Sequence, residues 1–379
     1  MTAKIACIVG TRPEAIKMAP VIMALRDQPW AEVVVVATAQ HRELADDVFD
    51  LFGIVPDLDL DLMQPGQTLS ELTARAMTAL DRVINDVAPD LVIAQGDTTS
   101  VMAVAMACFY RQVRFAHLEA GLRSFDLQNP YPEEFNRIVA SRIASLHFAP
   151  TEQARANLLK EGVSGASILV TGNTVIDALH WVAARDPELP LVVDASRRLV
   201  VVTVHRRENF GAPLQNICRA VRTLVDEHRD VEILWPVHPN PNVGPVVRAA
   251  FANMPRVHLV EPLRYGQFVA ALKRAYLILT DSGGVQEEAP ALARPVLVLR
   301  RETERPEAIA AGVARLIGTE CGDIVRHARE LLTGGVAYTI MARSVSPYGD
   351  GHASGRIVQA IRDMMAARPD PGYGPGARA

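Results

Sequence analysis

The chain has 379 residues, of which 49% are hydrophobic and 22% are charged, as is typical of a soluble globular protein with about two or three domains. Its formal net charge of −4 excludes the strongly basic surface expected for binding to nucleic acid or to an anionic membrane. Its four cysteines lie far apart without a C-x-x-C pair, so disulfides and a structural zinc site are not expected and a cytoplasmic location is favoured.

Neither a secretory signal nor a membrane span is predicted. The first apolar run, residues 5–9, has the length of a strand and leads into a polar loop. The longest apolar helix candidate, Val101 to Tyr110, is too short to cross a bilayer and is predicted to be a buried core helix. Residues 368–379 are rich in Pro and Gly without periodicity, which predicts a disordered tail.

Short β-branched runs alternate with longer amphipathic segments, which predicts βαβ units and parallel sheets. The first half predicts strands at 4–9, 33–38 and 91–94, with helices from about residue 13, through 46–52 and from about residue 99. After a helix and a Pro-containing link at 186–190, strands are predicted at 199–204, 232–236, 257–260, 276–279 and 295–299.

This pattern predicts an α/β fold of two doubly wound, Rossmann-like domains with a cleft between them. The expected N-terminal domain is 1–172 and the expected C-terminal domain is 173–365, its last helix being a candidate to pack back on the first domain. Ligands of doubly wound sheets bind beyond the carboxyl ends of the strands. The strand-to-helix loops are therefore the places where functional residues are expected.

Four of these loops in the first half carry charged residues. Arg12 lies at a helix start, where anions bind, and Lys17 follows Pro13 by one turn; the alternative is a solvated helix end. Asp97 follows the strand 91–94, either as a catalytic group or as the N-cap of the next helix.

The other two acidic loops hold Glu119, at a strand end, and Glu133 with Glu134, before a helix. Clustered carboxylates repel one another and shift each other's pKa values. Three acidic loops from one domain therefore suit proton transfer better than they suit stability.

The loops of the second half supply cations. His205 ends the first predicted strand of that half and can neutralise a diphosphate leaving group. Alternatively, it caps a helix or pairs with Glu208. Further loops place His238 after residues 232–236 and Arg305 after residues 295–299.

The segment 276–290 predicts a nucleotide site. A strand ends near Leu279, and a turn at 281–284 leads into a helix that begins near Val285. Glycines there let the backbone approach a ligand, and the N–H groups at the helix start attract a phosphate. Glu287 and Glu288 lie just inside the helix, where a carboxylate can accept both hydroxyls of a ribose. The alternative is an ordinary turn capped by Ser282.

Two patterns resemble metal sites and are discounted. The Asp-Leu alternation at 57–61 contains D-x-D, but strict alternation is what a half-exposed strand requires. His117-x-Glu119 resembles the zinc deaminases, yet no P-C-x-x-C follows it. No metal and no cofactor are predicted.

Taken together, the loops resemble the non-hydrolysing UDP-N-acetylglucosamine 2-epimerases, which have a two-domain glycosyltransferase-B fold. The resemblance runs in order from residue 10 to about 351 and covers nearly every strand-end loop. The matching segments are GTRPEAIKMAP (10–20), TAQHRE (38–43), GDTTS (96–100), HLEAGLRS (117–124), PEEFNR (132–137), TGNTVIDAL (171–179), HRREN (205–209), PVHPNPNV (236–243), TDSGGVQEEAP (280–290), TERPEA (303–308) and SPYGDG (346–351).

The resemblance implies three groups of functional residues. The implied catalytic residues are Asp97, Glu119, Glu133 and His205. The implied substrate-binding residues are Arg12, Lys17, Ser282, Gly283, Gly284, Glu288 and Arg305. A second UDP-GlcNAc activates bacterial members allosterically, and the positions that resemble its site are Gln40, His41, Gln67, Arg206 and His238.

The implied reaction inverts C2 of UDP-GlcNAc to give UDP-ManNAc, through loss of UDP to a glycal and its re-addition. The expected partners are these nucleotide sugars and a second copy of the chain, in the cytoplasm, with a role in polysaccharide biosynthesis. Three alternatives remain: a glycosyltransferase of the same fold that uses a UDP-sugar donor, an epimerase of a modified UDP-GlcNAc, and a non-catalytic UDP-sugar sensor.

Overall fold

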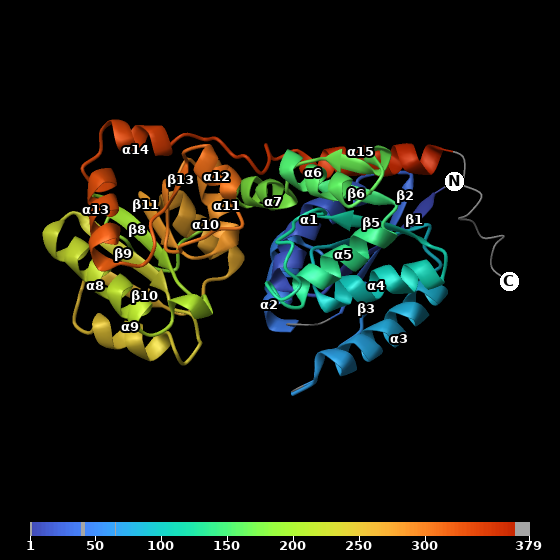
Figure 1. Ribbon diagram of the computed structural model, residues 1–379, viewed down its shortest axis with the longest axis horizontal. Helices are drawn as coiled ribbons and strands as arrows, with labels where there is room; N and C mark the ends of the chain where they lie inside the picture. The colour runs from blue at the N-terminus through green and yellow to red at the C-terminus, as the bar shows by residue number, and fades with distance from the viewer. Residues whose placement is uncertain (1, 39–41, 65, 368–379) are drawn as a thin grey trace. The chain divides into compact units, whose positions relative to one another are not determined.

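The computed structural model describes residues 2–38, 42–64 and 66–367, and the chain divides into two compact units (Figure 1). The first unit contains the residues up to Ala178 and those from Tyr348 onward; the second contains Leu179–Pro347. Residues 348–365, predicted within the C-terminal domain, thus belong to the first unit. Helix α15 (Ala353–Ala366) packs there against α1 (Arg12–Arg26), which is why the chain returns. The predicted tail lies outside the described residues.

The first unit has a seven-stranded parallel sheet in the order β3-β2-β1-β4-β5-β6-β7. Its strands are β1 (Ala3–Val9), β2 (Ala31–Ala37), β3 (Leu58–Asp59), β4 (Leu91–Gln95), β5 (Arg114–Leu118), β6 (Leu146–Ala149) and β7 (Ile168–Val170). Besides α1 and α15, its helices are α2 (Arg42–Phe52), α3 (Leu69–Val87), α4 (Thr99–Tyr110), α5 (Glu133–Ile143), α6 (Glu152–Lys160) and the start of α7 (Thr174–Ala183), with a 3-10 turn at Gly165–Ser167.

The second unit has a six-stranded parallel sheet in the order β10-β9-β8-β11-β12-β13. Its strands are β8 (Arg198–Thr203), β9 (Val231–Pro236), β10 (Val257–Val260), β11 (Leu277–Thr280), β12 (Val296–Val298) and β13 (Ala314–Leu316). Its helices are α8 (Ala212–Glu227), α9 (Gly244–Ala250), α10 (Tyr265–Arg274), α11 (Gly283–Ala291), α12 (Pro306–Ala310), α13 (Cys321–Leu332) and α14 (Val336–Met341), with a 3-10 turn at Arg207–Asn209.

The two sheets repeat one strand order. In each, the first strand in sequence lies at the centre, the next two extend to one side and the later strands extend to the other. The winding direction therefore reverses between β1 and β4 in the first unit and between β8 and β11 in the second. The prediction of two doubly wound α/β domains is confirmed.

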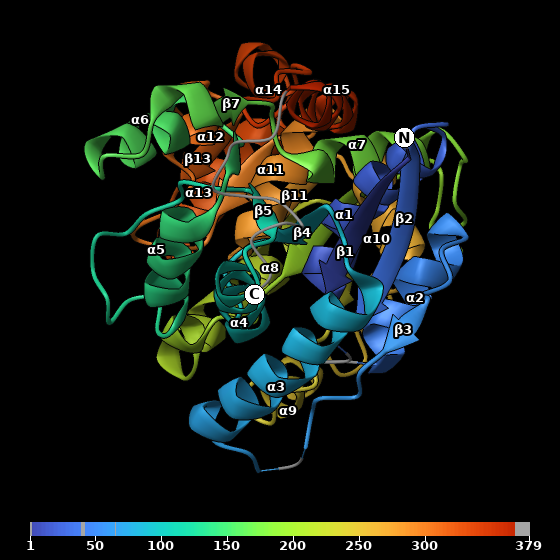
Figure 2. The ribbon, with the colours of Figure 1, turned by 90° about the vertical axis from the view of Figure 1, so that its right-hand side faces the viewer.

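Helices cover both faces of each sheet because alternate strand residues point to opposite faces. In the first unit, Ala6 and Ile8 of β1 share a buried cluster with apolar residues of α3 and α4. Figure 2 shows α3 and α4 next to each other on one face of this sheet and α1 on the opposite face. In the second unit, α8 and α13 pack together over Val200 and Val202 of β8.

Local sequence explains where the site helices begin. Thr11 is the N-cap of α1 and forms a capping box with Glu14, and Pro13 lies in the first turn. Thr98 is the N-cap of α4: its side chain accepts the N–H of Val101. Asp97 is therefore not the cap, and that alternative is wrong. The predicted core helix from Val101 is confirmed as part of α4, whose residues are mostly buried.

The discounted D-x-D segment differs from the expected half-exposed strand. Only Leu58 and Asp59 form β3, and both are exposed. The Asp57 carboxylate instead accepts the N–H of Val35 at 2.7 Å, which fixes the start of this short edge strand. Among the described residues, no helix has the length and apolar character needed to cross a membrane. The four cysteines are free thiols.

Candidate functional site

In the first unit, one lysine and two side-chain amides surround the carboxylate of Glu119. Glu119 directly follows β5 and has a φ of 60°, a left-handed conformation that is uncommon outside glycine. Lys17 Nζ lies 2.6 and 2.7 Å from its two carboxylate oxygens. Gln95 Nε2 donates to Oε2, and Asn173 Nδ2 donates to Oε1 at 2.9 Å. We call these four residues, Lys17, Gln95, Glu119 and Asn173, the Glu119 cluster.

The Glu119 cluster joins four segments that are far apart in sequence: α1, the end of β4, the end of β5 and the start of α7. Its donors all stabilise a charged carboxylate. Lys17 was predicted to bind substrate, and the structure pairs it with a predicted catalytic residue. Two members, Gln95 and Asn173, were not predicted, although Asn173 lies within the quoted segment 171–179.

Two residues of α5, the helix that begins at Glu133, hold Asp97 in place. Arg137 of α5 bonds to Asp97 Oδ2 through Nη2 at 2.7 Å and Nε at 2.9 Å. Asn136 Nδ2 donates to the Asp97 carbonyl at 2.8 Å. Arg137 also lies 3.0 Å from Glu134, so one guanidinium neutralises two carboxylates. These partners of Asp97 were not predicted as site residues, although both lie in the quoted segment 132–137.

The two carboxylates that begin α5 have different surroundings. Glu134 is buried, and its Oε1 accepts the N–H groups of Ser124 and Phe125 at 3.1 and 2.8 Å. It therefore fixes the loop after β5. Glu133 Oε2 is buried without a hydrogen-bond partner among the described residues. A buried carboxylate oxygen of this kind is costly unless a ligand or proton satisfies it.

Two buried groups position the loops after β1 and β4. Glu14 Oε2 accepts the N–H groups of Gly10 and Thr11 at 2.6 and 3.1 Å, and burial raises the pKa of this carboxyl to about 7. His117 Nε2 lies 2.7 Å from the carbonyl of Gly96. Burial lowers the pKa of His117 to about 4, so a neutral ring donates to that carbonyl and fixes the turn before Asp97.

In the second unit, Asp281 organises the strand-end loops. Its fully buried carboxylate accepts the N–H groups of His205 and Arg206 and the side-chain amide of Asn209. His205 Nδ1 lies 3.1 Å from Asp281 Oδ1, so the expected pairing of His205 with Glu208 is wrong. Burial opposes ionisation, but the hydrogen bonds and charge of His205 lower the pKa of Asp281 overall.

His238 lies beside this group, with its ring stacked on that of His205 at 5.8 Å between centroids. Burial, and then the neighbouring His205, lower the pKa of His238. Arg206 Nε donates to the Asp281 carbonyl at 3.0 Å. Arg206 and His238 were predicted as allosteric residues, and His205 was predicted to be catalytic. In the structure, Arg206 bonds to Asp281, which also binds His205, and His238 stacks on the His205 ring.

The cations of the second unit are paired with carboxylates. Arg206 and Arg300 both bond to Glu304, and Arg300 also lies 2.7 Å from Glu208. Burial would raise the pKa of Glu304, but Arg206 and Arg300 hold it at about 2. Two of the cations of these loops are therefore neutralised by carboxylates of the same unit.

The predicted nucleotide loop leads directly into α11. Ser282 is the N-cap residue but makes no side-chain cap bond, so the alternative of an ordinary capped turn lacks its main contact. Gly283 does not need a positive φ. A Cβ there would lie 3.1 Å from Glu304 Oε1, so close approach favours glycine. At Gly284, a Cβ would make only ordinary contacts.

Two carboxylates on α11 have separate partners within this unit. Glu288 is buried, and Tyr265 donates its hydroxyl to Glu288 Oε1 at 2.9 Å. Arg305 Nε bonds to Glu287, both side chains being mostly buried. Thr303 Oγ1 donates to Gln286 at 2.7 Å, which ties the Arg305 loop to the same helix. Tyr265 was not predicted as a site residue.

Arg12 and Gln67 are the remaining predicted positions among the residues that the structure describes. Arg12 is the first residue of α1 and is partly buried. Gln67 Nε2 contacts the sulfur of Met63, and its Oε1 accepts the N–H of Gln64. Gln40 and His41 lie outside the described residues. Among the residues that are described, no three His, Cys, Asp or Glu side chains group as metal ligands.

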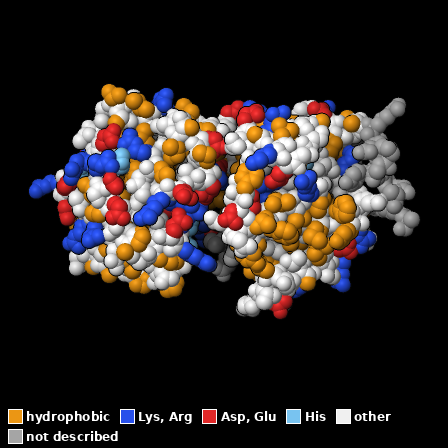
Figure 3. Space-filling model, viewed as in Figure 1, with side chains coloured by type: hydrophobic (Ala, Val, Ile, Leu, Met, Phe, Trp, Pro, Cys, Tyr) orange, Lys and Arg blue, Asp and Glu red, His pale blue; other side chains and the backbone are white. Residues whose placement is uncertain are grey.

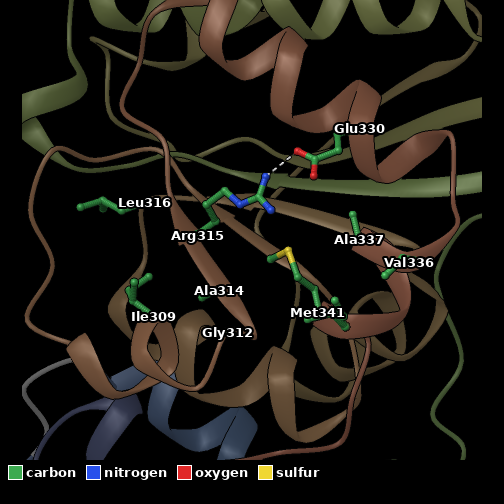
Figure 4. Close-up of a pocket in the computed structure, with 10 residues that line it drawn as sticks. Ile309, Gly312, Ala314, Arg315, Leu316, Glu330, Val336, Ala337 and Met341 are labelled. Atoms are coloured by element: carbon green, nitrogen blue, oxygen red, sulfur yellow. Dashed lines mark hydrogen bonds and ion pairs between the residues drawn. The ribbon is translucent and has the colours of Figure 1, made fainter.

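A separate cavity of about 670 Å³ lies in the second unit (Figure 4). It is lined by Ile309, Gly312, Ala314, Arg315, Leu316, Glu330, Val336, Ala337, Ile340 and Met341. Arg315 and Glu330 face each other across 2.7 Å, and the rest of the lining is mainly apolar. None of the predicted site residues lines this cavity, so it is distinct from the candidate site.

Known proteins resemble this chain over nearly its whole length. The family model described as UDP-N-acetylglucosamine 2-epimerase matches residues 23–362. The UDP-N-acetylglucosamine 2-epimerase of Escherichia coli (strain K12) is 46% identical over 374 residues, 95% of this chain and 98% of that protein.

Two solved structures agree with this match. One from Listeria monocytogenes has a TM-score of 0.91 and 45% identity, covering 99% of this chain and 100% of the other. The UDP-GlcNAc 2-epimerase of Neisseria meningitidis, solved bound to UDP-GlcNAc, has a TM-score of 0.88 and 41% identity over 95% of this chain and 100% of its own. The chain therefore has the expected glycosyltransferase-B-like fold and belongs to the UDP-N-acetylglucosamine 2-epimerase family.

Proposed function

We propose that the chain is an isomerase that interconverts UDP-GlcNAc and UDP-ManNAc by inverting C2. The observation that carries this proposal is the full-length match to the epimerase family, which includes a relative bound to UDP-GlcNAc. The reaction requires a group that removes the C2 proton, a group that returns a proton on the other face, and stabilisation of departing UDP. Each unit contributes residues suited to part of this task.

The first unit supplies the proton-transfer groups of the proposal: Asp97, Glu119 and Glu133. Glu119 and Asp97 are fixed by Lys17 and Arg137, which orients both carboxylates. The buried Oε2 of Glu133 has no hydrogen-bond partner among the described residues, so a ligand can satisfy it.

The second unit supplies the nucleotide site of the proposal. N–H groups in the first turn of α11 lack intrahelical partners and can receive a phosphate, together with Ser282, Gly283 and Gly284. Glu288 is proposed to bind the ribose hydroxyls and Arg305 to bind the nucleotide. With Nδ1 of His205 held by Asp281, Nε2 is the ring nitrogen proposed to face the diphosphate. Arg12 is the proposed cation of the first unit for the same charge.

The proposed chemistry is an elimination followed by an addition. The C1–O bond breaks and its electron pair leaves with UDP, while a carboxylate takes the C2 proton and a C1=C2 double bond forms. Re-addition returns a proton to the opposite face of C2 and reforms the bond to UDP. Donors aimed at the diphosphate stabilise the charge that develops on it, and a positioned base contributes roughly 10²- to 10⁴-fold. No hydride moves, and the atoms balance without a co-reactant.

Deuterium exchange tests this proposal. The chain is incubated with UDP-GlcNAc in D₂O, and the products are followed by proton NMR and mass spectrometry. We expect UDP-ManNAc to form and deuterium to enter at C2 of both sugars. Deuterium-free sugars with no ManNAc product would overturn the assignment.

The same assay separates the alternatives. A glycosyltransferase requires an acceptor and leaves C2 unlabelled, and a non-catalytic sensor binds UDP-GlcNAc without change. An epimerase of a modified substrate exchanges C2 of that derivative faster than C2 of UDP-GlcNAc. No contact among the described residues favours any of these three over epimerisation of UDP-GlcNAc.

We further propose a cytoplasmic homodimer. Figure 3 shows hydrophobic side chains gathered on the face of the first unit where α4 lies, and Phe109 and Tyr110 at the end of that helix are 58% and 65% exposed. Apolar surface of this kind is favourable to cover with a second subunit. Light scattering that gives the mass of a single chain at micromolar concentration would rule out the dimer.

A further inference from the structure

The Glu119 cluster contains one donor from the segment that leads out of the first unit. Lys17 and Gln95 belong to α1 and β4, next to the centre of the sheet. Asn173 instead lies just before α7, which carries the chain toward the second unit. Its side chain is almost fully buried, and its Nδ2 lies 2.9 Å from Glu119 Oε1.

The orientation of the Asn173 amide is fixed by its own backbone neighbours. Val175 donates its N–H to Asn173 Oδ1 at 3.2 Å, so the oxygen is the acceptor and the nitrogen faces Glu119. Asn173 N–H donates to the carbonyl of Tyr348 at 2.5 Å. Tyr348 is the residue at which the chain re-enters the first unit. Asn173 therefore lies in the segment that leaves the first unit and contacts the segment that returns to it. It also donates a hydrogen bond to the proposed catalytic carboxylate.

The two crossing segments are in close backbone contact around Asn173. A Cβ on Gly172 would lie 3.1 Å from the Cα of Gly349, and a Cβ on Gly349 would lie 3.4 Å from Asn173 N. Arg356 Nη1 donates to the carbonyl of Thr171 at 3.0 Å. The backbone of Asn173 is therefore held in place by direct contact between the outgoing and the returning segments.

We propose that Asn173 is a positioning residue that orients the Glu119 carboxylate by direct donation from its side-chain amide. The proposal rests on the proposed function only in that Glu119 is taken to be catalytic. Asn173 donates one hydrogen bond to the charged carboxylate and thereby lowers the energy of that form. It does not contact the substrate in this role, and it acts through Glu119.

Two substitutions at this position test the proposal. Asn173→Ala removes the donor, and Asn173→Asp keeps the size and the acceptor for Val175 but places a negative charge beside Glu119. We expect kcat to fall roughly ten- to a hundredfold in Asn173→Ala, the range for losing a hydrogen bond to a charged group, and further in Asn173→Asp. KM for UDP-GlcNAc and the affinity for UDP should change little, and the acid limb of the kcat–pH profile should move toward neutral pH.

Asp177→Asn is the matched control. Asp177 accepts the N–H groups of Ala353 and Ser354 at 3.2 and 2.8 Å, so it ties the same crossing segments together without contacting Glu119. We expect Asp177→Asn to lower the melting temperature while the kcat–pH profile stays that of the parent. If Asp177→Asn reproduces the kcat loss and the shifted profile, or if Asn173→Asp turns over like the parent, Asn173 has only a structural role and the proposal is overturned.

A readout without turnover keeps this test separate from the proposed function. In protein carrying ¹³C-labelled glutamate, the Glu119 carboxyl resonance is assigned by its absence in Glu119→Gln. We expect it to titrate at a higher pH in Asn173→Ala than in the parent. A parent chain that exchanges no deuterium would refute the epimerase assignment alone, whereas an unchanged Glu119 titration would refute the role of Asn173 alone.

Discussion

In the first unit the loop after β1 is fixed by Glu14, and in the second unit the loop after β8 is fixed by Asp281. β1 and β8 occupy the same place in the repeated strand order, and each carboxylate accepts two backbone N–H groups from the loop that follows. Both side chains are buried, at 3% and 0% exposure. Yet burial raises the pKa of Glu14 to about 7, whereas the pKa of Asp281 lies below its usual value.

The difference comes from the additional donors. Beyond the two backbone groups, Asp281 receives the side-chain amide of Asn209 and the ring of His205. Glu14 Oε1 is buried without a hydrogen-bond partner among the described residues. Burial disfavours the ionised form of both carboxyl groups. The number and charge of the hydrogen-bond donors then decide whether the ionised or the protonated form predominates. The two units also differ in their proposed roles: residues of the first unit transfer protons, and residues of the second unit bind the charged diphosphate.

The largest expected effect tests whether proton transfer belongs to the first unit. Asp97→Asn, Glu119→Gln and Glu133→Gln should each lower turnover by roughly two to four orders of magnitude, because each removes a carboxylate while preserving its shape. Calorimetry should show UDP binding largely intact. Near-parental rates in all three variants would remove the basis for assigning these roles.

The next effect tests the electrostatic contrast itself. Ionised Glu14 is disfavoured in the folded state, so the parent should lose stability as the pH rises from 4.5, its unfolded value, to about 7. Glu14→Gln lacks this loss, and its stability relative to the parent should rise by at most about 3 kcal/mol over that window. Urea unfolding at pH 4.5 and pH 7.5 measures the difference.

Asp281→Asn is the control for that experiment. The pKa of Asp281 is lowered, so its contribution to stability is lost only as the pH falls below the unfolded value of 3.8. Its destabilisation should therefore be the same at both pH values. A pH-independent effect of Glu14→Gln would show that the two carboxylates do not differ as described.

A smaller effect tests whether the second unit binds UDP. Glu288→Gln weakens the proposed ribose acceptor and Arg305→Ala removes a proposed nucleotide cation. Losing a hydrogen bond to a charged group costs roughly 1.5–3 kcal/mol, about ten- to a hundredfold in affinity. Calorimetry with UDP measures it, and Glu330→Gln, in the separate cavity, is the control. Unchanged affinity in both variants would place the nucleotide elsewhere.

The smallest effect concerns regulation. A second UDP-GlcNAc that binds only an activated state would shift the population toward it. We expect UDP-ManNAc alone to react slowly, a little UDP-GlcNAc to accelerate it, and the forward rate curve to be sigmoidal. His238→Ala should lower the Hill coefficient more than it lowers the maximal rate. Since His238 stacks on His205, an equal loss of both would assign His238 to the catalytic group instead.

Periodicity predicted the central strands of both sheets because parallel strands bury both faces and read as apolar runs, but it did not predict the short strands β6, β7 and β13. Glu119 and Asp97 were found because each follows a strand end, and Lys17 was found because it lies in the helix that follows the first strand. Gln95, Asn173, Asp281 and Tyr265 were not predicted as site residues. They are uncharged or lie in turns, and only the folded chain shows which carboxylate or loop each one contacts.

The sequence also did not predict which charged side chains form ion pairs. The sequence analysis expected the loops of the second half to supply cations, and Arg206, Arg300 and Arg305 lie in these loops. In the structure Glu304, Glu208 and Glu287 neutralise them. The number of charged residues in a loop predicts its electrostatic field only when their ion-pair partners are known. Those partners come from segments up to about a hundred residues away in the sequence.

The return of the chain at Tyr348 has a consequence for synthesis on the ribosome. The second unit is one continuous stretch, whereas the first contains α15, which is translated after the whole second unit. Domains generally fold as they emerge. The later segment should therefore complete its core first, leaving α1 uncovered until α15 arrives. Nascent chains stalled with Pro347 just outside the ribosomal exit tunnel should resist protease in Leu179–Pro347 while remaining cleavable near α1; equal resistance of both would exclude this order.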